Sequence, residues 1–221
     1  MDTRKNISLI RKNRYSTLKN WRNKMSLIDK LKQRRSYREF ELESFDIQLL
    51  IDAIEAAKYA PSGANKQPWT FCIIKNPEIK KEIRLQSEKI ELEFYKKISN
   101  DWKSDLNPLK VNAEKPFLEF APYLIVIFKH IFQYDQNHQQ TKVYYPDISV
   151  GIATGILITV LTDLGLDILT YTPYPNLFLR DILKRPDNEK PYIILVVGKG
   201  SSSYKLPEIT KKANEDIIII Y

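Results

Sequence analysis

Residues 147–166 read DISVGIATGILITVLTDLGL, and this stretch decides how the chain folds. It is too apolar for a helix at the protein surface, and Gly151, Ala153 and Gly155 permit close approach of a neighbouring backbone. We therefore expect a central helix. The stretch runs directly into DILTYT, residues 167–172, which contains strand-forming residues and predicts a β-strand.

Working outward from this helix, helical and extended patterns alternate along the chain. Nearly continuous apolar runs predict strands at 69–75, 122–129 and 191–198. Helices are predicted at 27–35, 77–99 and 175–185, and another is expected to begin at an N-cap, Ser44, and to end at Pro61 and Gly63. This pattern favours one layered α+β domain.

The composition limits the class of protein. With 221 residues and 43% hydrophobic content, the chain can bury one large core. A single cysteine, Cys72, excludes an internal disulfide, and two histidines without a cysteine cluster argue against a zinc site, so we expect no metal. The sequence has neither an uninterrupted apolar run of about twenty residues nor a signal peptide. We expect a cytoplasmic protein without a membrane span.

The positive charge is concentrated at the N-terminus. Residues 1–38 contain 13 Lys and Arg against 2 Asp and Glu, whereas the remainder contains 22 against 25. We therefore separate a basic extension, residues 1–24, from a folded domain, residues 25–221. Such an extension could contact nucleic acid or anionic lipid, but its apolar residues are too irregularly spaced for an amphipathic helix. A solvated or partner-bound extension is favoured, and no nucleic acid partner is expected.

A candidate ligand site begins with Glu91 and Tyr95, which are one turn apart on the predicted helix 77–99. A carboxylate and a phenol on one face could contact the same ligand, and Lys115 could add a cation from the following segment. Such a set could hold an ammonium and a carboxylate group at once. On their own, however, Glu91 and Tyr95 would be read as ordinary exposed helix residues.

A second candidate site is the segment RRSYR, which places Arg34, Arg35, Ser36 and Arg38 close together. Guanidinium groups bind phosphate oxygens through paired hydrogen bonds, and a hydroxyl adds a further donor. Arginines near the end of a helix also interact favourably with its dipole, which is the alternative reading. The sequence has neither GxGxxG nor GxxxxGK[ST], so a phosphate would be held mainly by side chains.

These segments together resemble the flavin-dependent nitroreductase superfamily over about residues 25–220. The resemblance rests on RRSYREF, APSGANKQPW, the glycine-spaced central helix, TYTP and KRPDNEKPYIILVVG. Within the superfamily, the set Glu91, Tyr95 and Lys115 is most similar to the iodotyrosine deiodinases. The resemblance implies a three-layer helix/sheet/helix α+β fold. It also implies an intertwined homodimer with FMN at the interface and the C-terminal segment exchanged onto the partner.

The resemblance also implies roles for individual residues. The expected FMN-binding residues are Arg34, Arg35, Ser36, Tyr37, Arg38, Ser62, Thr170, Tyr171, Thr172 and Lys211. Thr172 is the candidate catalytic residue, because the matching threonine of the deiodinases bonds the flavin N5. Glu91, Tyr95 and Lys115 would bind the zwitterionic end of a halotyrosine, and the backbone N–H of Ala64 would support its phenolate. Lys211 replaces an arginine of the family and lacks its bidentate fork.

The implied activity is FMN-dependent reductive dehalogenation of halotyrosines to tyrosine and halide. The electron donor would be NAD(P)H, directly or through a separate reductase. A broad-specificity nitroreductase or quinone reductase is the main alternative. Two further alternatives are flavin destruction to make a benzimidazole and a non-catalytic protein that binds flavin or an amino acid. In the deiodinase interpretation, residues 96–115 are a mobile segment that would order as a lid when Lys115 contacts the ligand.

Overall fold

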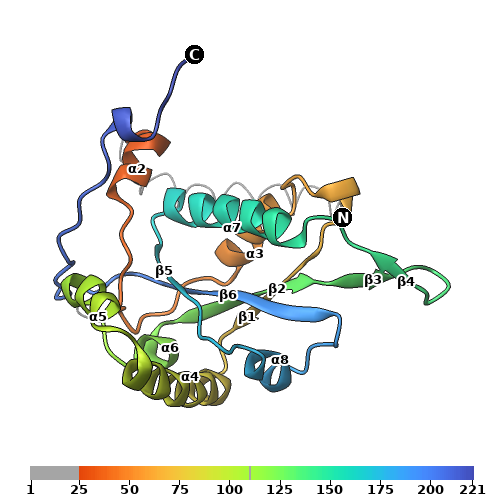
Figure 1. The fold of residues 1–221 in the computed structure, drawn as a ribbon, viewed down its shortest axis with the longest axis horizontal. Coiled ribbons are helices and arrows are strands. Elements are labelled where there is room, and N and C mark those ends of the chain that lie inside the picture. The colour runs from red at the N-terminus through yellow and green to blue at the C-terminus, as the bar shows by residue number, and fades with distance from the viewer. Residues whose placement is uncertain (1–24, 110) are drawn as a thin grey trace, which may run out of the picture.

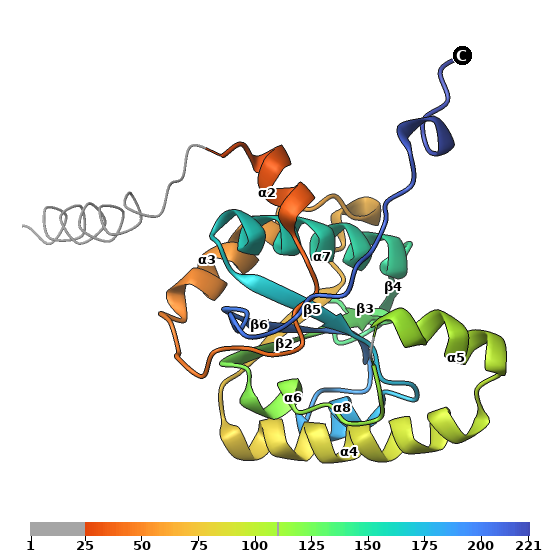
Figure 2. The same ribbon diagram turned by 90° about the vertical axis from the view of Figure 1, so that its left-hand side faces the viewer.

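The computed structural model describes residues 25–109 and 111–221, so the predicted basic extension, residues 1–24, lies outside the described residues. Within them, a sheet lies between two layers of helices (Figures 1 and 2). The predicted layered α+β fold is confirmed at this level. The layers matter for function because they fix which side chains meet at the end of the sheet.

The main sheet has four antiparallel strands in the order β1-β2-β6-β5. They are β1 (Trp69–Ile74), β2 (Tyr123–His130), β6 (Glu189–Gly198) and β5 (Asp167–Tyr171). All four were predicted. Six consecutive residues of β2, from Tyr123 to Phe128, are buried, as expected for a strand covered on both faces. A separate hairpin, β3 (Phe132–Tyr134) and β4 (Gln140–Lys142), was not predicted.

Each face of the sheet has its own helices and its own core. On one face lie α2 (Leu27–Gln33), α3 (Gln48–Ala57) and α7 (Pro146–Asp163); on the other lie α4 (Pro77–Lys97), α6 (Phe117–Phe120) and α8 (Phe178–Ile182) (Figure 2). Alternate residues of β2 face opposite cores, because Ile125 and Ile127 pack towards α3 and α7 while Leu124 and Val126 pack towards α6. The predicted three-layer arrangement follows from this alternation.

The central helix α7 is covered on one side only. Its residues Val150, Leu157 and Leu161 are fully buried in the core, but Ile148 and Ile152 are 63% and 41% exposed. Among the described residues, α7 alone is long and apolar enough to cross a membrane, with a mean hydropathy of 1.3. Its packing against the sheet is that of a core helix. The prediction of a central helix is therefore right for one face, and the other face, apart from the contact of α2 near Asp163, lacks a cover within the described chain.

The boundaries of α3 and of α8 differ from those predicted. Ser44 does not cap α3, because the helix begins at Gln48 and the Asp46 side chain accepts the Gln48 N–H at 3.0 Å. The helix also ends at Ala57, before Pro61. The helix predicted at 175–185 is shortened to α8, and Lys184 just beyond it adopts a left-handed φ of 49°. By contrast, α4 begins at Pro77, with the Asn76 side chain accepting two N–H groups.

A partly buried polar network joins the strands at the end of the sheet nearest the hairpin. The Thr70 hydroxyl donates to Glu189 at 2.7 Å and lies 2.9 Å from His130 Nε2, and Arg185 binds Glu189 through two hydrogen bonds of 2.8 Å. The Gln133 amide nitrogen lies 3.3 Å from His130 Nδ1. With that amide as donor, Nδ1 is the acceptor and the ring is neutral. Burial lowers the pKa of His130, and Glu189 opposes the shift.

We predict that this histidine makes the protein less stable in mild acid. A histidine in the unfolded chain takes up a proton near pH 6.5, whereas the folded protein resists protonation of His130. Below that pH the unfolded state binds more protons, so the free energy of unfolding falls as the pH falls. Urea unfolding at a fixed protein concentration, at pH 7.5 and 5.5, should show a smaller fall in His130→Asn than in wild type.

The matched control is His138→Asn, which removes the other histidine. His138 is exposed in the turn between β3 and β4, where its φ of 59° is a conformation that asparagine tolerates. This variant should keep the wild-type difference between the two pH values. Equal pH dependence in wild type and His130→Asn would contradict the prediction.

A cavity between the sheet and α4

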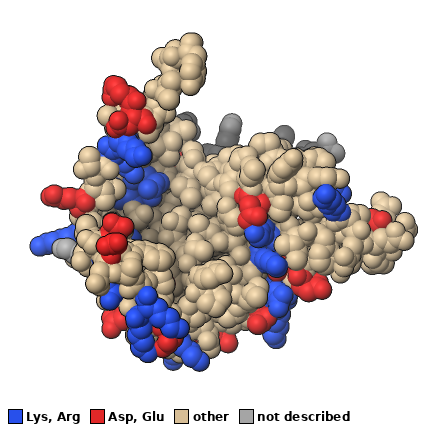
Figure 3. Space-filling view, in the orientation of Figure 1, with Lys and Arg blue, Asp and Glu red and all other residues tan. Residues whose placement is uncertain are grey.

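A cavity of about 440 Å³ opens at the end of the sheet where β5 stops. Its walls come from α4, from α5 (Asn100–Leu106), from the segment before α6 and from the end of β5. Figure 3 shows this face hollowed, with Lys and Arg side chains gathered where Figure 1 shows α2 and the C-terminal segment. The lining is mostly aromatic and charged: Arg38, Glu91, Phe94, Tyr95, Trp102, Lys115, Phe117, Thr170, Tyr171, Thr172 and Tyr204 among others. Such a wall suits a flat ligand with a charged group.

An ion pair lies in this cavity. The Lys115 ammonium is 3.2 Å from Glu91 Oε2, and the two side chains are only 7% and 14% exposed. The other oxygen of Glu91, Oε1, accepts a hydrogen bond of 2.9 Å from the Tyr171 hydroxyl. The two sequence-predicted residues are thus brought together from α4 and from the segment before α6, and Tyr171 joins them from β5.

The position of Lys115 is fixed by its backbone as well as by its charge. Its N–H donates to Glu88 Oε1 at 2.7 Å, and its ammonium also donates to the Asn112 carbonyl. Arg84 then links Glu88, at 2.9 Å, to Glu119, at 3.0 Å. Burial lowers the pKa of Lys115, and the Glu91 carboxylate opposes that shift. This ammonium is therefore partly desolvated and depends on an anionic partner.

Tyr95 and the predicted lid form the aromatic side of the cavity. The Tyr95 ring centroid is 5.5 Å from the Lys115 ammonium, and burial raises the pKa of the Tyr95 phenol. Trp102 on α5 packs edge-on against Phe94 of α4, with ring centroids 4.9 Å apart. The segment predicted as a lid thus contains a helix held over the cavity by an aromatic contact. Its mobility stays a prediction.

The arginine segment runs beside β5 and the C-terminal segment. Ser36 pairs with Ile168 in a parallel bridge, and Phe40 pairs with Gly200. The Arg35 guanidinium donates to the Pro207 carbonyl, and Arg38 lines the cavity. Lys211 is exposed further along the same C-terminal segment. Of the predicted phosphate-binding residues, only Arg38 lines the cavity, and the guanidinium there suits a cofactor with a phosphate group; for Arg34, Arg35, Ser36 and Lys211 that role stays a prediction.

The side chain of Tyr37 contacts the protein rather than the cavity. A Cβ on Gly200 would lie 2.1 Å from the Tyr37 ring, so the ring covers that glycine closely, and its centroid is 6.0 Å from that of Tyr204. Burial raises the pKa of the Tyr37 phenol. Its contact with the cofactor stays a prediction.

Thr170, Tyr171 and Thr172, at the end of β5, were all predicted to bind the cofactor, but their side chains do not share one environment. Within β5, Thr170 projects to one side of the strand and Tyr171 to the other, because successive side chains alternate, and Thr172 follows directly after the strand. Tyr171 packs in the core beside α4, α6 and α8, whereas Thr170 is exposed at the cavity. The Tyr171 hydroxyl is thus bound to Glu91, and Thr170 and Thr172, which line the same cavity, remain available to a ligand.

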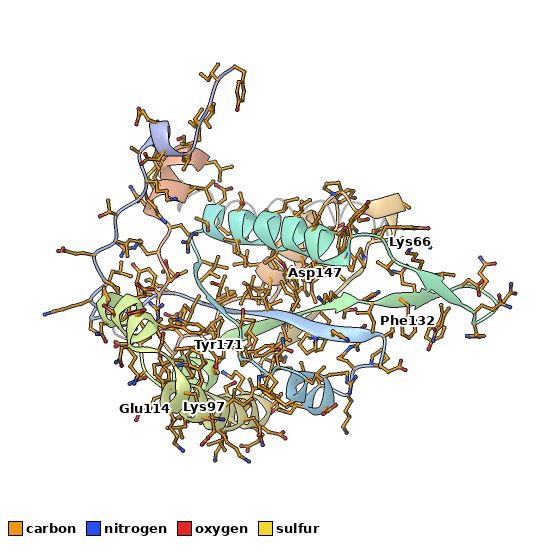
Figure 4. The ribbon with its side chains drawn as sticks, in the orientation of Figure 1. Lys66, Lys97, Glu114, Phe132, Asp147 and Tyr171 are labelled. Atoms are coloured by element: carbon orange, nitrogen blue, oxygen red, sulfur yellow. The ribbon has the colours of Figure 1, made fainter. Side chains whose placement is uncertain are left out.

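The turn containing Ser62 and Ala64 is not brought to the cavity. A short 3₁₀ helix, Gly63–Asn65, forms the turn, with Ala64 at a left-handed φ of 50° and the Ser62 hydroxyl accepting the Gln67 N–H at 2.9 Å. Gly63 is needed there because a Cβ would lie 2.7 Å from the Tyr144 carbonyl oxygen. Figure 4 shows Lys66, next to the turn, on the other side of the molecule from Glu114, and well separated from Tyr171 near its centre.

Sequence reasoning missed several residues that shape the cavity. Glu88 accepts a hydrogen bond from the Lys115 backbone. Its position one turn before Glu91 places it on the same helix face, and this spacing could have identified it from the sequence. The direction of Tyr171 could have been inferred from strand alternation with Thr170 and Thr172. Trp102 gave no pattern by itself, since its role depends on how the segment after α4 folds back.

The chain is similar to known proteins over most of its length. Residues 31–199 match the model of the nitroreductase family. An iodotyrosine deiodinase of Haliscomenobacter hydrossis is 41% identical over 189 residues, 85% of each chain. One of Drosophila melanogaster is 38% identical over 199 residues, 88% of this chain and 69% of that protein.

Solved structures agree with these relatives. A crystal structure of oxidised iodotyrosine deiodinase bound to FMN and 3-iodo-L-tyrosine superposes with a TM-score of 0.76 at 31% identity, covering 89% of this chain and 98% of that one. A BluB-like flavoprotein of Clostridium difficile shares the fold, with a TM-score of 0.68 at 21% identity, covering 89% of this chain and 99% of that one. The chain belongs to the nitroreductase family and, within it, to the iodotyrosine deiodinases.

Proposed function

We propose that this protein is an FMN-dependent reductive dehalogenase of halotyrosines. The observation on which the proposal rests is the buried pair of Glu91 and Lys115 in an aromatic-walled cavity, 3.2 Å apart and next to Thr170 and Thr172. A relative at 41% identity is an iodotyrosine deiodinase, and a similar structure contains FMN and 3-iodo-L-tyrosine. The cavity geometry and the family lead to the same substrate class.

The charged pair suits the amino acid head group of a halotyrosine. Glu91 can accept hydrogen bonds from an ammonium group, and Lys115 can donate to a carboxylate. In this structure the two side chains neutralise each other, so a zwitterionic ligand can exchange one ion pair for two without leaving a buried charge unpaired. The phenol of Tyr95 would add a donor or acceptor at the same end. A ligand without a head group makes none of these exchanges.

The cofactor would lie beside β5 and the arginine segment. Arg34, Arg35, Ser36 and Arg38 would hold its phosphate and ribityl chain, with Lys211 as a further cation. The Thr172 hydroxyl would contact the flavin N5 and Thr170 would contact the ring, which fits their position at the cavity. When bound, FMN supplies two electrons to the substrate. The proposed reaction breaks the carbon–halogen bond and forms a carbon–hydrogen bond, consuming two electrons and one proton and releasing halide.

We further propose that the site is completed in a homodimer with exchanged C-terminal segments. Ser62 and Ala64 are far from the cavity of their own chain, so they can serve a cofactor and a phenolate only at the site of a second copy. The uncovered face of α7, with Ile148 and Ile152, and the exposed terminal residues Ile217–Tyr221 supply apolar surface for such a contact. Each cavity would then be closed by the turn of the other subunit.

The setting of the reaction is also a proposal. A cytoplasmic location agrees with the single, partly buried cysteine, Cys72. We propose NAD(P)H as the ultimate electron donor, either directly or through a separate reductase. The tests below do not depend on that choice, because a chemical reductant can supply the electrons.

The dimer can be tested on α7. Placing a charge in an apolar interface should be strongly unfavourable, so Ile152→Glu is expected to give a monomer that loses FMN. Light scattering after gel filtration and the flavin absorbance of the purified protein would measure both effects. Leu85→Glu is the control, since Leu85 is 55% exposed on the outer side of α4. An Ile152→Glu protein that stays dimeric would count against this interface.

The head-group assignment can be tested at Glu91. Glu91→Gln keeps an acceptor for the Tyr171 hydroxyl but removes the charge that faces an ammonium group. We expect the Kd for 3-iodotyrosine to rise about 10- to 100-fold, with unchanged FMN content, as for loss of a charge-assisted hydrogen bond. Titration calorimetry on FMN-loaded protein would measure it. Glu93→Gln, an exposed change on the same helix, should leave the Kd unaltered.

The reaction itself is tested by anaerobic reduction of the FMN-loaded protein with dithionite, followed by 3-iodotyrosine or 4-iodophenol. We expect iodide and tyrosine release from 3-iodotyrosine and little release from 4-iodophenol, because only the first has a head group for Glu91 and Lys115. If neither compound releases iodide while nitroaromatics are reduced, the protein is a general nitroreductase and the proposed substrate class is wrong.

A further inference from the structure

The Tyr171 hydroxyl donates a hydrogen bond to Glu91, and the proposed reaction does not by itself require this bond. We propose that Tyr171 is a positioning residue that determines specificity: its hydroxyl fixes the Glu91 carboxylate for the ammonium group of an amino acid ligand. The inference rests on the proposed function and deepens it. It assigns recognition of the ligand's ammonium to a pair of residues, Glu91 and Tyr171, rather than to Glu91 alone.

The two oxygens of Glu91 are divided between two partners. Oε1 accepts from the Tyr171 hydroxyl at 2.9 Å, and Oε2 lies 3.2 Å from the Lys115 ammonium. When Lys115 turns to the carboxylate of a bound ligand, the bond to Tyr171 is the contact that still defines the orientation of Glu91. An ionised carboxylate oxygen can accept more than one hydrogen bond. Oε1 can therefore keep Tyr171 while Oε2 receives the ligand.

Tyr171 is held firmly enough to serve as a fixed reference. Its backbone is in register with Ile194 of β6, and its ring packs edge-on against Phe117 with centroids 5.8 Å apart. Glu91, by contrast, is a long side chain on a helix, and fixing its rotamers on ligand binding costs free energy. A hydroxyl that orients it in advance reduces that cost and so increases affinity for the group that Glu91 binds.

The hydroxyl is also a permanent donor. Burial raises the pKa of Tyr171 strongly, and the neighbouring Glu91 carboxylate raises it further, so the phenol stays protonated at any pH at which the enzyme would work. The Lys115 ammonium lies 5.9 Å from the Tyr171 ring centroid. A single aromatic side chain thus contacts both members of the ion pair, with its hydroxyl on the anion and its ring near the cation.

The test compares two ligands that differ only in the ammonium group. These are 3-iodotyrosine and its deaminated analogue, 3-(4-hydroxy-3-iodophenyl)propanoate. In FMN-loaded Tyr171→Phe, we expect the Kd for 3-iodotyrosine to rise about tenfold, as for loss of one hydrogen bond to a charged group. The Kd for the analogue should change less than about twofold. KM for 3-iodotyrosine should rise with kcat nearly unchanged, because the bond acts on binding.

Two controls separate positioning from packing. Tyr123→Phe removes another tyrosine hydroxyl, one that donates to the Phe45 carbonyl at 2.8 Å away from the cavity, and should leave both Kd values unchanged. In a Glu91→Ala background, Tyr171→Phe should have no further effect on 3-iodotyrosine binding, because it acts through Glu91. Should Tyr171→Phe fail to fold, Tyr171→Met keeps a flexible apolar side chain without the hydroxyl and should show the same ammonium-specific loss.

The outcomes distinguish this inference from the proposed function. If wild type binds 3-iodotyrosine no more tightly than the analogue, recognition of the ammonium is absent and both ideas are wrong. If wild type prefers 3-iodotyrosine and Tyr171→Phe keeps the full preference, the proposed function stands and the role of Tyr171 is overturned. Equal weakening of both ligands would likewise overturn it, because that result reports only the packing of the ring.

Discussion

The site depends on the burial of one positive and one negative charge beneath the aromatic wall formed by Phe94, Tyr95 and Trp102. A buried ion pair is a weak source of stability, because desolvating the two groups offsets most of their attraction. The surroundings accordingly supply further partners: Glu88 for the Lys115 backbone and Tyr171 for the Glu91 carboxylate. The result is a pair poised to exchange partners with a zwitterion. The ion pair therefore serves the binding of a complementary ligand more than the stability of the fold.

The remaining components are arranged by the sheet. The edge strand β5 places side chains on two sides of one short segment, and its last residues, Leu169–Tyr171, together with Thr172, line the cavity that contains the ion pair and would receive the flavin. The arginine segment is aligned by its bridge to β5 and by the C-terminal segment that it contacts. Binding and electron transfer would therefore share one structural support, and a shift of this strand would disturb both.

Much of the fold could be predicted because its signals are local. Apolar runs identified three strands of the main sheet, the strand-forming residues of DILTYT identified the fourth, and the Asn76–Pro77 start of α4 followed ordinary capping rules. The hairpin β3–β4 was missed because it is polar and short, and the Ser44 cap was wrong because Asp46 competes for the same role. For the site, resemblance identified Glu91 and Lys115. It could not separate Tyr171 from its threonine neighbours, nor place Ala64 away from the cavity, since both depend on tertiary geometry.

The length of α7 determines how far apart the segments at its two ends lie. The turn containing Ser62 and Ala64 packs near Tyr144, just before the helix begins, and Lys30 of α2 bonds to Asp163 where the helix ends. Its 18 residues span about 27 Å at 1.5 Å per residue. In the proposed dimer, this length would contribute to the distance between a subunit's own cavity and the turn, with Ser62 and Ala64, that it places at the partner's cavity. Insertions should therefore be tolerated in the β3–β4 hairpin but excluded from α7 during the divergence of these enzymes.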